Sequence, residues 1–220
     1  MTKGIPAAVL AFALAISLAA CGTEGRGETA AATAEASTVQ AFDIAEFDLW
    51  LMSRYKEAYK LRCNAGLYYT HQIVEVLNGT LRLNERVLRS LIETKDKLEA
   101  EADALTQLVQ SKAKDDSAND MEALQQLCVL NLAGMLLSDQ MALDTCALAL
   151  ISYTEGSASK AESHRREAYR LFQSTKEYMD EFQAARAAML DLGGLSKSDA
   201  IEKAENDRAE IEEQYVGEVG

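Results

Sequence analysis

Proline is almost absent from this chain of 220 residues, whose only proline is Pro6. Proline ends or kinks a helix because it lacks a backbone N–H group and its ring clashes with the preceding turn. Nothing after Pro6 therefore forces a helix to stop in this way. The ends of any long helices must instead be marked by clusters of Gly, Asn, Ser and Asp.

Histidine is also scarce, and the common catalytic motifs are missing. The chain has two histidines, His71 and His164, and it contains no Cys-x-x-Cys-His, Gly-x-Ser-x-Gly or His-Glu-x-x-His motif and no Gly-rich phosphate loop. One His beside one carboxylate supplies too few ligands for a specific metal site. We therefore predict that the protein is not an enzyme and holds no metal or cofactor.

Basic side chains are in short supply. Lys and Arg number 22 against 35 Asp and Glu, a net charge of −13. Lys3 is the only charged side chain among residues 1–20. Loss of these residues would leave 21 basic and 35 acidic side chains, a net charge of −14. Such a surface repels the phosphates of nucleic acids and anionic lipid headgroups. We therefore exclude nucleic acid as a partner and expect any membrane attachment to come from another source.

The first 20 residues have the pattern of a signal peptide. Lys3 supplies a positive start, and residues 5–20 form an apolar run of sixteen residues rich in Ala and Leu. This length fits the core of a signal peptide. A transmembrane anchor, the alternative, needs about 20 apolar residues and usually has charged or aromatic anchors at its ends.

The residues that close this run are Leu18, Ala19, Ala20 and Cys21, followed by Gly22. They resemble the lipobox of bacterial lipoproteins, and the resemblance covers residues 1–22 only. It implies cleavage before Cys21, a diacylglyceryl group on the sulfur of Cys21 and an acyl chain such as palmitate on its new amine. Gly22 in place of Asp favours the outer membrane, facing the periplasm, over the inner membrane. The alternative is an ordinary secretory signal with an incidental cysteine.

Residues 21–40 are predicted to be a lipidated cysteine followed by a flexible linker. Positions 22–40 consist mainly of Gly, Ala, Thr, Glu and Ser and offer almost no bulky apolar group to repay the entropy of ordering. A flexible coil of this length spans about 24 Å. The body that follows would therefore stand clear of the lipid.

The remaining residues predict an all-α protein. Apolar residues recur at helical spacing over about 42–79, 81–111, 119–153 and from Gly156 to 192, and Leu91, Leu98 and Leu105 lie on a coiled-coil-like heptad seam that also includes Leu88. Four such helices joined by short turns form an antiparallel bundle. We place this bundle at 41–195 and a short acidic helix and tail at 196–220. The third helix is apolar on nearly every side and is expected to be the core rather than a membrane span.

Four residues are candidates for a small-ligand or metal site between the first, third and fourth helices. They are Tyr59, His71, Asn131 and His164. Ordinary packing is the alternative for each of them. Asn131, with Asp139 and Asp144, is a polar exception on the apolar third helix, and such groups either specify helix register or line a pocket.

Three cysteines follow Cys21: Cys63, Cys128 and Cys146. Cys128 and Cys146 lie about 27 Å apart along one predicted helix and cannot pair with each other. A disulfide must therefore join Cys63 to Cys128 or to Cys146. The alternative is that all three are buried thiols acting as small apolar residues.

These patterns favour a lipid-anchored helical bundle of the cell envelope. We expect it to act without catalysis, as a scaffold, adaptor or accessory subunit that binds another protein. The alternative function is a bundle that binds a small ligand or metal at the four candidate residues.

Overall fold

A computed structural model of the protein describes residues 44–112 and 120–219, and no strand occurs in these ranges. The expected all-α class is confirmed. The elements are α2 (Ile44–Tyr68), the π-helix η1 (Tyr69–Ile73), α3 (Val74–Leu77), α4 (Glu85–Lys112), α5 (Asp120–Thr154), α6 (Ala158–Leu192) and α7 (Lys197–Val219). The residues that resemble a lipobox, Cys21 among them, and the predicted linker lie outside the described residues.

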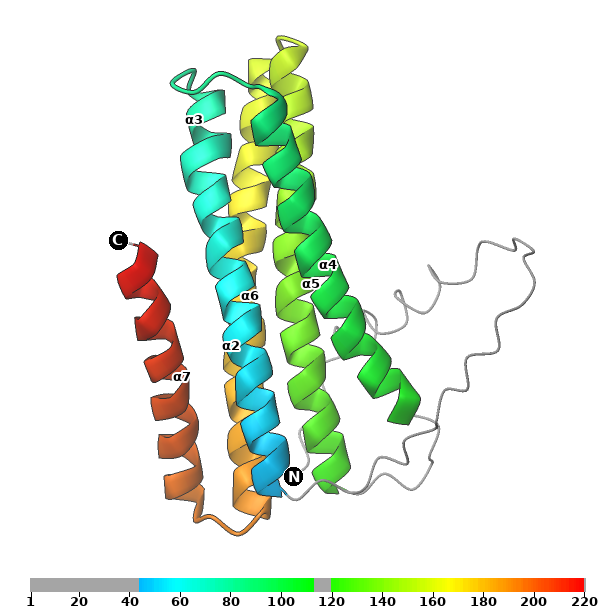
Figure 1. Cartoon of the computed structure of the whole chain (residues 1–220), viewed down its shortest axis with the longest axis vertical. Coiled ribbons are helices and arrows are strands. Elements are labelled where there is room, and N and C mark those ends of the chain that lie inside the picture. The colour runs from blue at the N-terminus through cyan, green and yellow to red at the C-terminus, as the bar shows by residue number, and fades with distance from the viewer. Residues whose placement is uncertain (1–43, 113–119, 220) are drawn as a thin grey trace, which may run out of the picture. The chain divides into compact units, whose positions relative to one another are not determined.

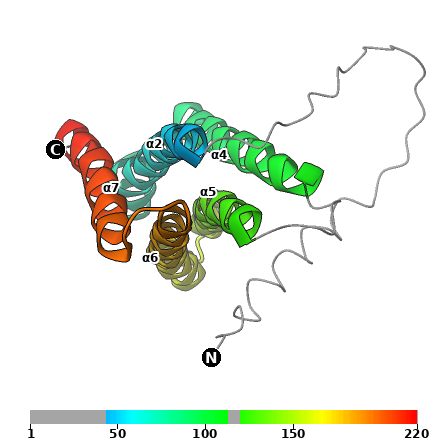
Figure 2. The ribbon, with the colours of Figure 1, turned by 90° about the horizontal axis from the view of Figure 1, so that it is seen from below.

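Four long segments form the bundle. The segment from α2 to α3 runs up in Figure 1, α4 returns, α5 runs up again and α6 returns. The end-on view shows α2 and α4 on one side of the bundle and α5 and α6 on the other (Figure 2). The antiparallel bundle of four long helices is therefore confirmed, with α2 and α5 parallel to each other across it. The closest packing joins α5 to α6.

α5 is the core helix of this bundle. It is long and apolar enough to cross a membrane by length and composition, but more than half of its most apolar window is buried inside the bundle. Gly134 of α5 lies against the ring of Tyr178 on α6, and a Cβ atom added to Gly134 would come within 2.5 Å of that ring. The absence of a side chain at Gly134 lets the two helices approach.

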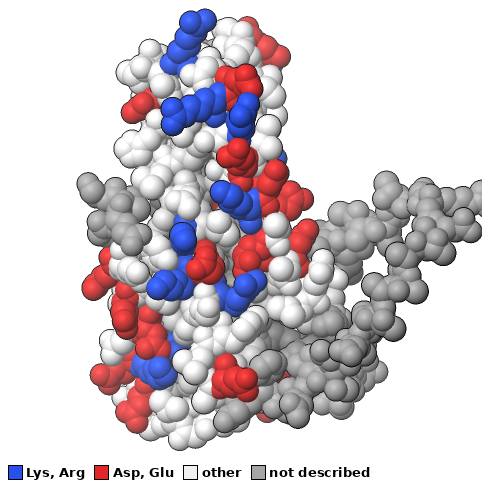
Figure 3. Space-filling view, viewed as in Figure 1, with Lys and Arg blue, Asp and Glu red and all other residues white. Residues whose placement is uncertain are grey.

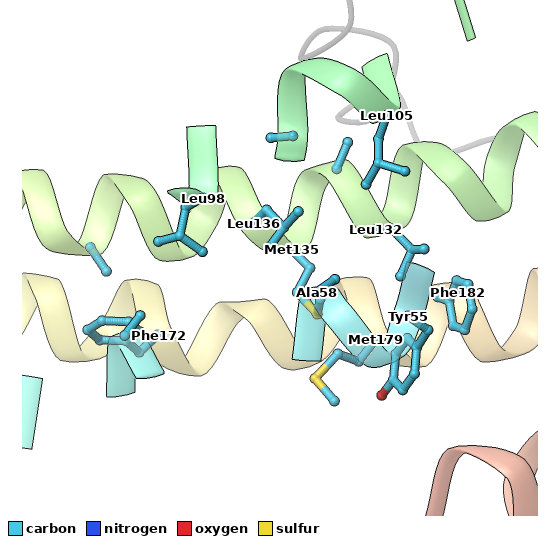
Figure 4. Packing of buried hydrophobic residues seen from close by; sticks show 14 of the residues in the cluster. Tyr55, Ala58, Leu98, Leu105, Leu132, Met135, Leu136, Phe172, Met179 and Phe182 are labelled. Carbon is cyan, nitrogen blue, oxygen red and sulfur yellow. The ribbon is translucent and has the colours of Figure 1, made fainter. Parts of the chain in front are cut away.

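The buried apolar side chains form one cluster shared by all the long helices (Figure 4). Leu98 and Leu105 of α4 point toward Leu132 and Leu136 of α5. The heptad prediction holds for Leu91, Leu98 and Leu105, all of which are buried, as is Ala102. It is wrong for Leu88, which is 43% exposed.

The helix ends follow the predicted glycine and asparagine signals in most places. Gly66 does not interrupt α2, whose direction continues through η1 into α3 as far as Leu77. Gly193 caps α6, and Ser196 accepts a hydrogen bond from the backbone N–H of Asp199 at the start of α7. The N-cap residue of α6 is Ser157, and the Glu162 carboxylate accepts hydrogen bonds from Arg165 and Arg166.

α7 is a helix of 23 residues that lies along the outside of the seam between α2 and α6 (Figures 1 and 2). Close backbone contacts join α7 to both of these helices, whereas α2 and α6 have few with each other. Ala200, Ala204 and Tyr215 are buried. Ile211 is half-buried, and Ile201 is 41% exposed. α7 therefore covers part of a gap that the four-helix bundle leaves open.

Candidate functional site: the polar seam beneath α7

Tyr59 lies at this seam. It is half-buried, and its ring packs 6.0 Å from the ring of Tyr55 and 6.2 Å from the ring of Tyr215 on α7. Burial, together with the nearby Cys63 and Glu212, raises the pKa of Tyr59 to about 12. Tyr59 therefore serves as an aromatic contact between α2 and α7.

His71 and Asn131 lie at different levels of the bundle. The pair of Arg62 and Asp139 marks one level on the parallel helices α2 and α5. His71 is exposed and lies nine residues beyond Arg62, while buried Asn131 lies eight residues before Asp139. At 1.5 Å per residue, His71 and Asn131 are about 25 Å apart along the bundle axis. The structure does not bring the four candidates into one site.

His164 is half-buried near the start of α6. It borders an open surface hollow of about 700 Å³ whose charged walls, Glu162, Arg166, Glu167 and Arg170, come from the same helix. These acids and bases are already paired with one another. Among the described residues, no three His, Cys, Asp or Glu side chains form a group suited to a metal ion.

The three described cysteines are free thiols. Cys63, for which a disulfide was considered, is only half-buried. Burial raises the pKa of Cys128 and of Cys146 to about 12. Both thiols therefore stay protonated and pack as small apolar groups.

The first polar junction of the seam joins three helices through Arg186, which is 1% exposed. Its Nε and Nη2 atoms donate to the two carboxylate oxygens of Asp48 on α2, at 2.6 and 2.9 Å. Nη2 also donates to Asp207 on α7. Burial opposes the charge of Arg186, but these two carboxylates raise its pKa above the ordinary value. Arg186 of α6 thus binds one acid from α2 and one from α7.

The second junction lies further along α7. The hydroxyl of Tyr55 donates to Glu212 at 2.8 Å, and its ring stacks on Phe182 of α6 with centroids 4.9 Å apart. Arg208 of α7 donates to Asp180 at 3.0 Å and to Gln183 at 2.8 Å. Side-chain hydrogen bonds therefore join α7 both to α2 and to α6.

A separate buried ion pair lies between α2 and α5. Asp139 is fully buried and accepts hydrogen bonds from Arg62 at 3.1 Å and from the hydroxyl of Thr175 at 2.8 Å. Burial raises the pKa of Asp139 to about 7, against the opposing effect of these partners. Arg62 also donates to the backbone carbonyl of Phe172 on α6. This cluster fixes the register of three helices.

The other polar exception on α5, Asp144, pairs with Lys95 of α4. Asp139 and Asp144 therefore each bind a cation on another helix, as expected for groups that specify register. For Asn131 the side-chain Nδ2 atom is buried and has no hydrogen-bond partner in the described residues.

The residues of the two seam junctions were not among the candidates predicted from the sequence. For Arg186, the spacing of its neighbours was the available signal. It lies four residues after Phe182 and three before Met189, on the apolar side of α6. A charge at such a position requires a partner from another helix.

Comparison with protein-family models, with curated proteins and with solved structures finds no match to this chain.

Proposed function

We propose that this protein is a lipid-anchored bundle of the bacterial cell envelope that acts by binding another protein, without catalysis. The anchor would be a lipid on Cys21, within the sequence Leu18-Ala19-Ala20-Cys21-Gly22 that resembles a lipobox. Two or three acyl chains hold a protein on a bilayer where one chain gives only reversible binding. Gly22 supports the outer membrane, facing the periplasm.

The observation that carries the association role is the polar seam. Arg186 and Tyr55 of the four-helix body bind Asp207 and Glu212 of an added helix. Such a surface recognises an amphipathic helix by charge and shape, which is a common mode of protein association. The ionisable groups of the seam are paired with one another, which supports a binding role rather than a reaction.

The alternative of a small-ligand or metal site receives less support. Tyr59 packs against aromatic rings, and His71 and Asn131 lie at different levels of the bundle. We therefore keep the association role as the single proposal.

The anchor is tested by replacing Cys21→Ser and separating membranes from soluble extract. Wild type is expected in the membrane fraction and Cys21→Ser in the soluble fraction, with Cys63→Ser as the matched control that behaves like wild type. Unchanged membrane association of Cys21→Ser would refute lipid anchoring. The association role is tested by purifying the cross-linked native protein from detergent-solubilised envelopes, where recovery of no stable protein partner, including a second copy, would contradict it.

A further inference from the structure

α7 is held to the body mainly by polar contacts. In residues 197–215 the buried side chains are Ala200, Ala204 and Tyr215, two of which are small. The carboxylates of Asp207 and Glu212 that bind the seam remain partly exposed to solvent. Because water can replace such contacts, separating α7 requires less free energy than separating α5 from α6.

The seam keeps its recognition groups when α7 leaves. Arg186 retains Asp48 on α2 but loses Asp207 as its second carboxylate. The Tyr55 hydroxyl loses its acceptor Glu212. The uncovered guanidinium then has donor atoms left for a second carboxylate. The vacant seam therefore favours a helix that presents acids at the positions of Asp207 and Glu212.

The turn that carries α7 back onto the seam is short and depends on glycine. Only residues 193–196 separate α6 from α7. Gly194 has a φ of +106°, which side chains other than hydrogen rarely allow. Opening this turn would release α7 without altering either helix. Short hinges of this kind favour the exchange of an element between copies.

We propose that α7 is exchanged between two copies of this chain, so that each copy binds the α7 of the other along its α2–α6 seam. The second copy is the favoured occupant because its α7 carries the same groups that already fit the seam. Asp207 and Glu212 of one copy would bind Arg186 and Tyr55 of the other. The proposal rests on the proposed association role, and anchoring in one membrane would raise the effective concentration of the copies.

Ile201 is a suitable position for a cross-linking probe. It is 41% exposed and borders a hollow of about 330 Å³ with Ala184 and Ala187 of α6. The solvent-facing side of α7 is acidic, and Figure 3 shows acidic side chains on the side of the molecule where α7 lies. The exposed acids of α7 include Glu202, Glu205, Glu210 and Glu213. A benzophenone at position 201 would therefore report which α6 lies beneath α7.

The test mixes two isotopic forms of the full chain, purified in detergent, each carrying Ile201→p-benzoylphenylalanine. One form contains ¹⁴N and the other ¹⁵N. The two forms are mixed in urea, refolded together at high concentration and irradiated. Mass spectrometry then identifies peptides that link residue 201 to residues 180–187. Exchange predicts linked pairs of mixed isotope. Pairs of a single isotope alone would show that α7 stays on its own body and would overturn the proposal.

The hinge provides a matched pair of variants. Gly194→Ala strains the closed turn of the monomer. The equilibrium constant for forming the exchanged dimer from two monomers is therefore expected to rise about fivefold for each of its two hinges. Gly66→Ala, in open space within α2, is expected to leave the mixed fraction unchanged. An unchanged mixed fraction in Gly194→Ala would also overturn the proposal. The proposed anchor is judged separately by the Cys21→Ser fractionation, so the two failures are distinguishable.

Discussion

Arg186 and Asp48 form a bidentate ion pair inside the bundle, 138 positions apart in the sequence. The pair is fully enclosed on the Arg186 side and nearly so on the Asp48 side. Parallel hydrogen bonds of this kind fix the relative height and rotation of the helices that carry them. The pair therefore positions α2 against α6 at the level where α7 adds Asp207.

The losses of stability on removing the two members of this pair should not be additive. Asp48→Ala leaves a buried guanidinium without its main partner and is expected to lower the free energy of unfolding by about 3 kcal/mol or more. The double variant Asp48→Leu with Arg186→Leu should lose less than the sum of the single variants. Urea unfolding followed by far-UV circular dichroism measures both, and additive losses would contradict the pairing.

Asp139 should make stability depend on pH. Burial raises its pKa to about 7 from an ordinary value of 3.8, so between these values the folded state binds more protons than the unfolded state. Its stabilising contribution is therefore full below about pH 4 and is lost as the pH rises through 7. The free energy of unfolding should therefore fall between pH 4 and pH 8, and Asp139→Asn is expected to reduce this fall by on the order of 2 kcal/mol. Urea unfolding from pH 4 to pH 8 tests this, and equal slopes in the two proteins would be inconsistent with it.

Gly134 should tolerate no side chain, in contrast with Gly66. Gly134→Ala brings a methyl group into the ring of Tyr178 and is expected to destabilise the protein by about 1–2 kcal/mol. Gly66→Ala meets no neighbouring atom and should stabilise α2 by about 0.5–1 kcal/mol. Thermal and urea unfolding provide the comparison. In a Tyr178→Ala background the penalty at Gly134 should disappear, and its persistence would exclude the ring as the cause.

The described thiols should differ in reactivity. Cys63 is half-buried, whereas Cys128 and Cys146 are buried and their pKa values are raised to about 12. A maleimide should therefore modify Cys63 in the native protein well before the other two, and all three after unfolding without reductant. Peptide mass spectrometry identifies the modified sites. A disulfide-linked peptide containing Cys63 would contradict the structure.

Much of the fold follows from the periodicity of apolar residues. Leu91, Leu98 and Leu105 repeat every seven residues, and all three are buried. Leu88 fits the same repeat but is exposed near the start of α4, because a heptad pattern alone does not specify where the partner helix contacts it. Local sequence therefore predicted the helices better than their packing.

The seam could not be predicted from the sequence alone. Its ion pairs join residues on different helices, so they depend on which helices are neighbours and at what height. His71 and Asn131 illustrate the same limit, since both met the criteria for a site and lie about 25 Å apart along the axis. Asp139 was recognisable as a polar exception on α5, but its partner Arg62 was not.

The mass of the N-terminal peptide of the protein extracted from membranes tests the central claim most directly. Lipid anchoring predicts a mature chain that begins at Cys21 and carries a diacylglyceryl group on the cysteine sulfur, with or without an acyl chain on the amine. A chain that retains residues 1–20, or that begins at or before an unmodified Cys21, would contradict it.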